Sequence, residues 1–187
     1  ENKSNLIGKL IIVILVVGGA FLAWKFLTSS NSSETPKVTA SVEESSKITE
    51  SDKVAGNPTS QVVFVEYGDY QCPACGAYYP VIKQLKEEYR DKVAFIHRDF
   101  PLRSLHKHAQ IAAQAAFAAA NQDKFWEMHD KLYETQDDWS EVRDPRSDFE
   151  KFANELSMDV EKFKTDMNSD AARDYVNNSY NSAVAMG

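Results

Sequence analysis

The sequence predicts an α/β fold in which two strands and a connecting helix are followed by helices to the end of the chain. Three observations lead to this prediction. One run rich in β-branched and aromatic residues spans 61–67, and a second spans 93–100 and ends at Pro101. Between them, apolar residues recur at helical spacing from 73 to about 90. The short links between these segments indicate a right-handed βαβ unit with two parallel strands.

The region from about 104 to 185 is predicted to be helical. Its apolar residues favour separate helices over 108–120, 124–135, 148–156, 160–167 and 169–185. The first of these is rich in alanine, which permits close approach of neighbouring helices. The others carry aromatic and methionine side chains at helical spacing, a pattern typical of a packed core rather than of a ligand-binding surface.

The size and charge of the chain narrow the classes of function. Its 187 residues suffice for one ordinary domain plus appendages. The formal net charge of −7 argues against a general nucleic-acid-binding protein, which would show a basic face. We expect this acidic balance to serve solubility rather than a specific partner.

The N-terminal residues are predicted to attach the chain to a membrane. After a flank at 1–9, an apolar run at 10–27 is interrupted only by Lys25. Eighteen residues at about 1.5 Å each give a helix of about 27 Å, close to the thickness of a hydrocarbon core. We therefore expect a single transmembrane anchor. A cleaved signal peptide is the alternative, with small residues at 18–20 as its cleavage site.

A linker is expected between this anchor and the globular domain. Residues 28–58 are dense in Ser, Thr, Glu and Lys and have few large apolar side chains. Such a segment buries too little surface to offset the entropy of ordering it, so the sequence predicts a disordered, flexible tether. The globular domain is then expected at 59–187.

The only two cysteines, Cys72 and Cys75, lie between the first predicted strand and the first predicted helix. The start of a helix carries a partial positive charge and free N–H groups, which favour a thiolate at Cys72. A structural disulfide is a weaker interpretation, because so short a loop constrains the unfolded chain little. A zinc site would need two further ligands, for which His106 and His108 are the paired candidates. The pattern therefore favours a redox-active dithiol.

Glu66 is the third candidate site residue, since it lies on an otherwise apolar strand six residues before Cys72. A carboxylate is costly there unless it is paired or protonated. The alternative is that strand alternation turns Glu66 outward to solvent. Asp69 is expected to be a turn residue, Tyr70 is expected to pack beside the dithiol, and no chemistry is assigned to the second strand.

Several segments together resemble DsbA-like thiol-disulfide oxidoreductases of the thioredoxin superfamily. The similarity spans about 61–187 and rests on the run 64–75 with Cys-Pro-Ala-Cys, on Pro80, on Arg-Asp-Phe-Pro-Leu at 98–102 and on 124–130. The resemblance implies a thioredoxin-like fold with a helical domain inserted at about 104–185. In the family a Thr-Pro pair with a cis proline, two strands and a helix follow this point. The sequence therefore leads us to expect a truncated piece whose C-terminal strands come after Gly187.

The resemblance also implies an activity. Cys72 would be the nucleophile, Cys75 would resolve the mixed disulfide, and Glu66 would match the buried acid that shuttles a proton of the second cysteine. The implied role is to oxidise cysteines of unfolded exported proteins, with a membrane quinone-linked thiol reoxidant, in a domain held outside the cytoplasm. No cofactor, metal or nucleic acid is expected. The alternatives are a disulfide reductase or isomerase, a non-catalytic metal-binding module, and a binding module with an inert disulfide.

Overall fold

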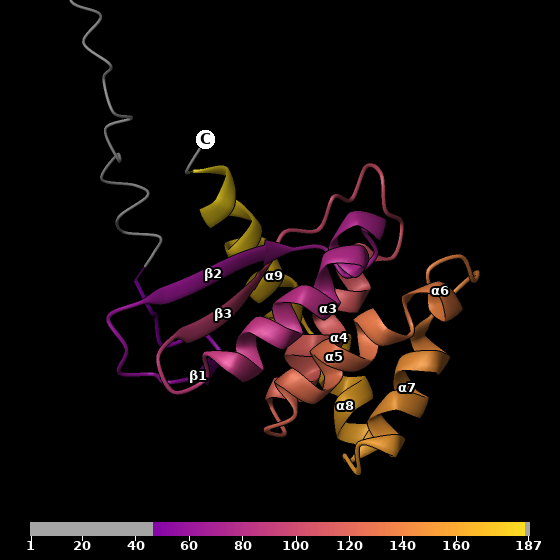
Figure 1. The fold of residues 1–187 in the computed structure, drawn as a ribbon. Helices are drawn as coiled ribbons and strands as arrows, with labels where there is room; N and C mark the ends of the chain where they lie inside the picture. The colour runs from indigo at the N-terminus through magenta and orange to yellow at the C-terminus, as the bar shows by residue number, and fades with distance from the viewer. Residues whose placement is uncertain (1–46, 186–187) are drawn as a thin grey trace, which may run out of the picture. The chain divides into compact units, whose positions relative to one another are not determined.

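The computed structural model of the chain describes residues 47–185, and Figure 1 shows its elements in order along the chain. Three strands form one sheet: β1 (Val54–Gly56), β2 (Val63–Gly68) and β3 (Ala94–Asp99). One helix, α3 (Pro73–Glu88), connects β2 with β3. The helices that follow β3 are α4 (Ala109–Ala120), α5 (Phe125–Glu134), α6 (Gln136–Trp139), α7 (Arg146–Glu155), α8 (Val160–Met167) and α9 (Asp170–Val184).

The strand order in the sheet is β1-β3-β2. β2 pairs with β3 in parallel, with Glu66 opposite His97, and this confirms the predicted βαβ unit. β3 is buried at every position, which suits the central strand of a sheet covered by helices. β2 is only half-buried along most of its length. Among the strands that the structure describes, β2 has a neighbour on one side only, and this explains its exposure.

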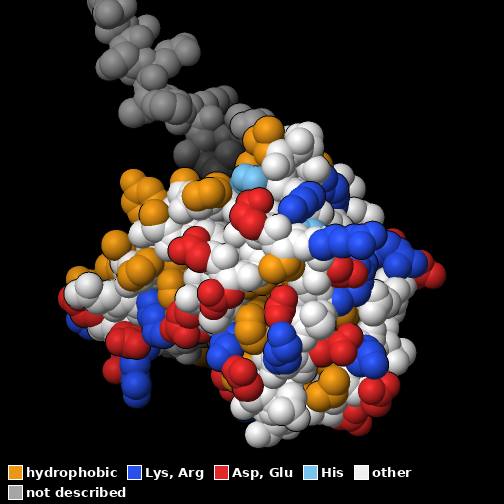
Figure 2. Space-filling view, turned by 90° about the vertical axis from the view of Figure 1, so that its right-hand side faces the viewer, with side chains coloured by type: hydrophobic (Ala, Val, Ile, Leu, Met, Phe, Trp, Pro, Cys, Tyr) orange, Lys and Arg blue, Asp and Glu red, His pale blue; other side chains and the backbone are white. Residues whose placement is uncertain are grey.

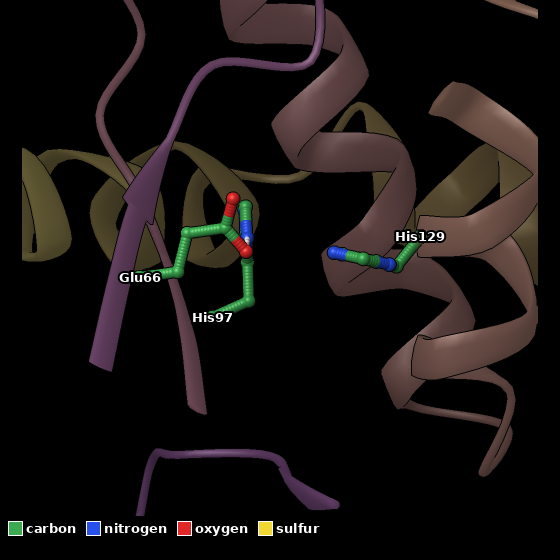
Figure 3. A group of neighbouring side chains, drawn as sticks. All are labelled: Glu66, His97 and His129. Carbon is green, nitrogen blue, oxygen red and sulfur yellow. Dashed lines mark hydrogen bonds and ion pairs between the residues drawn. The ribbon is translucent and has the colours of Figure 1, made fainter. Parts of the chain in front are cut away.

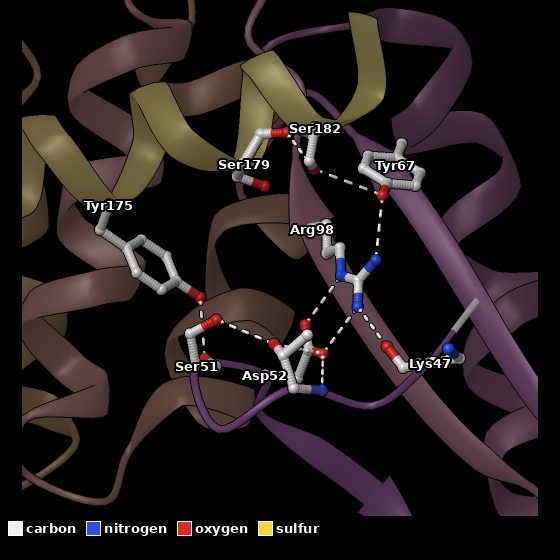
Figure 4. Close-up of polar contacts among 9 residues, drawn as sticks. Lys47, Ser51, Asp52, Tyr67, Arg98, Tyr175, Ser179 and Ser182 are labelled. Atoms are coloured by element: carbon white, nitrogen blue, oxygen red, sulfur yellow. Dashed lines mark hydrogen bonds and ion pairs between the residues drawn. The ribbon is translucent and has the colours of Figure 1, made fainter. Parts of the chain in front are cut away.

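The prediction of a disordered linker at 28–58 is wrong for its last part. β1 pairs antiparallel with β3, and the residues just before β1 are fixed by polar contacts. The guanidinium of Arg98 on β3 donates to both carboxylate oxygens of Asp52, at 2.8 and 2.7 Å, and to the carbonyl oxygen of Lys47 at 2.8 Å (Figure 4). These contacts need polar residues, so a polar composition concealed an ordered segment. Residues 28–46 lie outside the described part of the chain.

The helical region confirms the predicted insertion after the second strand of the βαβ unit. The alanine-rich α4 lies at its centre and contacts α5, α7, α8 and α9. Its small side chains let these helices approach closely, as the sequence predicts. The large side chains that fill the core around it are fully buried: Met128, Leu132, Trp139, Phe149, Phe163, Met167 and Val176.

Local capping explains where two of these helices begin. The side chain of Asp159 accepts a hydrogen bond from the backbone N–H of Lys162 at the start of α8. The hydroxyl of Ser169 accepts one from the N–H of Ala172 at the start of α9. Both residue types satisfy backbone donors that a helix start leaves free. The one-turn α6 was not predicted, because four residues are too few to show a helical pattern.

The surface carries charges of both signs. On the face that Figure 2 presents, acidic and basic side chains are interspersed with apolar ones. None of the helices within 47–185 is sufficiently long and apolar to span a membrane. The predicted anchor at 10–27 lies outside the residues that the structure describes.

Candidate functional site

Cys72 and Cys75 lie where the sequence predicts, at the start of α3. Cys72 is the N-cap residue, with an extended backbone at φ −70° and ψ 120°, and Pro73 takes the first turn of the helix. The carbonyl oxygen of Cys72 accepts a hydrogen bond from the N–H of Gly76 at 3.0 Å. Both thiols are free and partly buried. Cys72 is therefore the residue from which the helix begins, although its side chain makes no capping hydrogen bond.

Cys75, one turn into α3, is held as a neutral thiol. Burial raises its pKa, and the neighbouring Cys72 raises it further, to about 11, although a backbone hydrogen bond at Asp69 opposes the shift. Cys75 also packs against the hydrophobic core. Its proton therefore has to be removed before its sulfur can act as a nucleophile.

The turn between β2 and α3 is fixed by the carboxylate of Asp69. This buried side chain accepts hydrogen bonds from the backbone N–H groups of Gln71 and Leu102, both at 2.8 Å. It also contacts Nδ1 of His106 at 2.8 Å. The prediction of a turn residue is confirmed, and the carboxylate also ties the dithiol turn to the loop after β3. That second function depends on residues far along the chain and has no local sequence signal.

Two glutamines join the dithiol loop to the helical insertion. Gln71 donates to the carbonyl oxygen of Ser140 at 2.7 Å and accepts from the N–H of His108 at 2.6 Å. Gln136 of α6 donates to the carbonyl oxygens of Tyr70 at 2.6 Å and Cys72 at 3.0 Å. The insertion therefore sets the path of the backbone that carries the dithiol. Sequence reasoning missed both glutamines, because nothing in their neighbourhood distinguishes them from surface residues.

Gly76 leaves the space that Gln136 occupies. A Cβ atom at position 76 would lie 2.5 Å from Oε1 of Gln136, too close for any real contact. The residue after Cys75 is therefore glycine because the amide of Gln136 passes directly over this turn of the helix.

Glu66 faces the inside of the molecule rather than solvent. Its side chain is 18% exposed, and Oε2 lies 3.5 Å from Nδ1 of His97 on the neighbouring strand. Figure 3 shows Glu66 and His97 side by side, with the ring of His129 on α5 pointing toward them. The alternative that Glu66 points to solvent is therefore wrong. His97, to which the sequence assigned no chemistry, is its nearest partner.

The carboxyl of Glu66 is ionised at neutral pH. Burial raises its pKa, but the hydrogen bond with His97 and the positive charges of His97, His129 and Lys86 outweigh that effect and lower it. Burial lowers the pKa of His129 to about 4, so the ring of His129 adds positive charge only in acid. A carboxylate of this kind can accept a proton from a neighbouring group.

The pKa of Tyr133 is affected by both Glu66 and the dithiol. Burial, followed by the negative charges of Glu66 and Cys75, raises its pKa well above the ordinary value. Tyr70, expected beside the dithiol, is buried in the core, with its ring centroid 4.9 Å from that of His97 and 5.0 Å from that of Tyr133.

The structure does not bring the histidines of the proposed zinc module to the cysteines. His106 contacts Asp69, and Nε2 of His108 lies 2.8 Å from the carbonyl oxygen of Val142. Within residues 47–185, the one group of three side chains with metal-ligating atoms close together is Glu66, His97 and His129. The dithiol is not part of it.

A three-stranded sheet, a helical insertion and Cys-x-x-Cys at a helix start are the features of a thioredoxin-like protein. A sequence profile of the thioredoxin family matches residues 48–187. The chain belongs to the thioredoxin family.

Solved structures share this fold. alpha-DsbA1 of Wolbachia pipientis superposes with a TM-score of 0.69 at 21% identity, over 79% of this chain and 74% of that one. A thioredoxin-like oxidoreductase from Silicibacter pomeroyi gives 0.62 at 26% identity, over 73% and 75%. BdbD of Bacillus subtilis gives 0.65 at 22% identity, over 73% and 76%. These likenesses confirm the thioredoxin-like fold with its helical insertion.

Curated relatives are similar over the same region. The chain is 41% identical over 113 residues to the Na(+)/H(+) antiporter NhaA 3 of Salinispora tropica, which is 60% of this chain and 16% of that protein. It is 33% identical over 138 residues to the NhaA antiporter of Herminiimonas arsenicoxydans, 74% of this chain and 21% of that protein. The chain thus spans about a fifth or less of the relatives it matches, and their name describes much longer proteins.

Proposed function

We propose that the chain is a thiol-disulfide oxidoreductase that oxidises pairs of cysteines to disulfides, with Cys72 as nucleophile and Cys75 as resolving residue. The observation that carries this proposal is the asymmetry of the dithiol. Cys72 stands at the N-cap position of α3, whereas Cys75 lies one turn in, where burial and the neighbouring Cys72 keep it protonated with a pKa of about 11.

The proposed exchange needs only the two enzyme cysteines and two substrate thiols, with no other oxidant. A substrate thiolate attacks Sγ of Cys72 in the enzyme disulfide, the S–S bond breaks, and Cys75 leaves and takes up a proton. A second substrate thiolate then attacks the substrate sulfur of the mixed disulfide and releases Cys72 as a thiolate. Two substrate thiols are oxidised and the enzyme disulfide is reduced. In the reverse step, the carboxylate of Glu66 accepts the proton that Cys75 loses.

Cys75→Ser tests the assignment of roles. The variant should accumulate mixed disulfides through Cys72, seen as bands on non-reducing gels that disappear on reduction, whereas Cys72→Ser should accumulate none. Equal trapping by both variants, or by neither in an oxidising compartment, would contradict the assignment.

Glu66→Gln tests the proton acceptor. Loss of the carboxylate should slow resolution of a preformed mixed disulfide by about a hundred-fold at neutral pH, the scale of one positioned base. Glu87→Gln, on the exposed surface of α3, is the matched control and should leave the rate unchanged. An unchanged rate in Glu66→Gln would remove Glu66 from the mechanism.

The direction of net exchange separates an oxidase from a reductase or isomerase. An oxidase needs a reduced dithiol that is more stable than that of a reductase, because this makes the disulfide a better oxidant. Titration against glutathione should therefore give a potential well above about −250 mV, within the superfamily range of about −270 to −120 mV. A lower value would favour the reductase.

The proposed partners are unfolded exported proteins with cysteines and a quinone-linked thiol reoxidant in the membrane. The apolar run at 10–27 and the polar stretch after it support a domain tethered outside the cytoplasm, where disulfides persist. Protease added to intact cells should digest the domain if it faces outward, and an intact domain would contradict this orientation.

A further inference from the structure

Buried polar atoms without hydrogen-bond partners are concentrated around the rings of His97 and His129. Seven buried side-chain nitrogen or oxygen atoms in the described residues have no hydrogen-bond partner. Five of them belong to one cluster: Tyr70 Oη, His97 Nε2, Asp99 Oδ1, His129 Nε2 and Tyr133 Oη. Since an unpaired buried polar atom is costly, such a concentration indicates a bound water or ion.

The same cluster presents a ligand set. Glu66, His97 and His129 each offer one ligand atom, and these atoms lie within 4.8 Å of one another. Oε2 of Glu66 and Nδ1 of His97 are 3.5 Å apart, close to the separation of about 3.4 Å between ligands at about 2.1 Å from a tetrahedral ion. The ring of His129 is 2% exposed and its Nε2 has no partner (Figure 3). A shift of about 1.4 Å in this side chain, from a separation of up to 4.8 Å to one of about 3.4 Å, would complete a three-ligand site.

A carboxylate is hydrogen-bonded to the second ring nitrogen of His129, and another lies near that of His97 without a hydrogen bond. Nδ1 of His129 lies 2.9 Å from Oδ1 of Asp130, which orients the ring and leaves Nε2 for a ligand bond. Nε2 of His97 lies 3.8 Å from Oδ1 of Asp99, on the side of the ring away from Glu66. Histidines that bind metals usually have their second ring nitrogen hydrogen-bonded to a carboxylate or carbonyl oxygen.

We propose that Glu66 Oε2, His97 Nδ1 and His129 Nε2 form a binding site for a divalent transition-metal ion, with zinc as the ion that two imidazoles and one carboxylate suit. The hydroxyls of Tyr70 and Tyr133, buried beside these rings, are available to a metal-bound water. The site is separate from the dithiol but uses the carboxylate of Glu66. Metal occupancy therefore competes with the proton transfer proposed for that residue.

The test uses the full chain without a histidine tag and with both cysteines alkylated, so that thiolates contribute no ligand. Titration with Co²⁺ should produce visible ligand-field absorption that saturates at one ion per chain and is lost when Zn²⁺ is added. His129→Gln should weaken Co²⁺ binding at least ten-fold, and Asp130→Asn should weaken it about ten-fold through the orientation of His129.

His106→Gln is the matched control, because this histidine contacts Asp69 and is not one of the three proposed ligands. It should retain the wild-type affinity for Co²⁺. Thermal melting shows which variants fold, and Glu66→Gln, at a half-buried edge-strand position, decides the outcome if His129→Gln does not fold. Absence of the cobalt spectrum in the alkylated wild type, or a spectrum unchanged in Glu66→Gln, would overturn the proposal. Neither result depends on the exchange activity.

Discussion

The side-chain amide of Gln136 donates to the backbone carbonyl oxygen of Cys72 at 3.0 Å. The same nitrogen donates to the carbonyl oxygen of Tyr70 at 2.6 Å, so one side chain of the helical insertion holds the backbone on both sides of Gln71. The insertion thereby supports the backbone at Cys72, and it also contributes to the core. Substitutions in α6 should therefore affect the backbone that carries the dithiol.

Gln136→Ala should destabilise the chain by about 2–3 kcal/mol. Two hydrogen bonds disappear, at roughly 1 kcal/mol or more each, although the carbonyl oxygen of Cys72 keeps its bond from the N–H of Gly76. Urea unfolding measures the change. Gln84→Ala, on the exposed face of α3, is the control and should change stability by less than about 0.5 kcal/mol. Equal effects of the two substitutions would show that the contacts of Gln136 contribute nothing.

Gly76→Ala should be destabilising in the presence of Gln136 and slightly stabilising in its absence. The new methyl group would displace the amide that bonds Cys72 and Tyr70, because a Cβ there lies 2.5 Å from Oε1 of Gln136. In a helix, alanine is otherwise favoured over glycine by up to about 1 kcal/mol. A double-mutant cycle should therefore give a coupling energy of about 1 kcal/mol or more. Additive effects would contradict the proposed steric conflict.

The ion pair between Asp52 and Arg98 should make stability depend on pH in acid. Burial raises the pKa of Asp52, but Arg98 and Thr49 outweigh it and lower the pKa below its ordinary value near 3.8. A depressed pKa in the folded state adds stability above the unfolded value, and this contribution is lost as pH falls through the folded value. The window is therefore below about pH 4.

Asp52→Asn should remove this contribution. At neutral pH we expect a loss of about 3 kcal/mol, since the substitution removes one charge from a buried pair. Below pH 4 the variant and the wild type should converge. Asp91→Asn is the control, because that side chain is 90% exposed. A constant difference between variant and wild type across the acid range would contradict the role of ionisation.

The sequence predicted the elements that rest on local patterns. The parallel strand pair, α3 and the five longer helices of the insertion follow from spacing and β-branched runs within single segments. β1 was missed because it has three residues and lies in a polar stretch whose order depends on Arg98, some 40 residues later. Its stabilising contacts are non-local, and composition alone could not show them.

In the candidate site, too, residues with a local sequence signal were predicted and residues that meet only in the fold were not. Cys72 and Cys75 were found because both cysteines and the helix start are adjacent in sequence. His97 and His129 were not, since they lie on different elements and meet Glu66 only when α5 packs against the sheet. A histidine on a buried strand was the available signal, but its partner could not be chosen without the fold.

Alkylation of the reduced dithiol should label Cys72 first. Burial and the neighbouring Cys72 hold the pKa of Cys75 at about 11, so at pH 8 only about one Cys75 in a thousand is a thiolate. The rate of labelling at Cys75, followed by mass spectrometry of its peptide, should rise about ten-fold per pH unit up to pH 11. In Cys72→Ser the rate should remain slow, because burial is the larger cause of the shift.

The same raised pKa predicts that the reduced chain loses stability as pH rises from about 9 to about 11. A labelling rate at Cys75 that levels off below pH 9 would show an ordinary thiol and remove the asymmetry on which the proposed exchange depends.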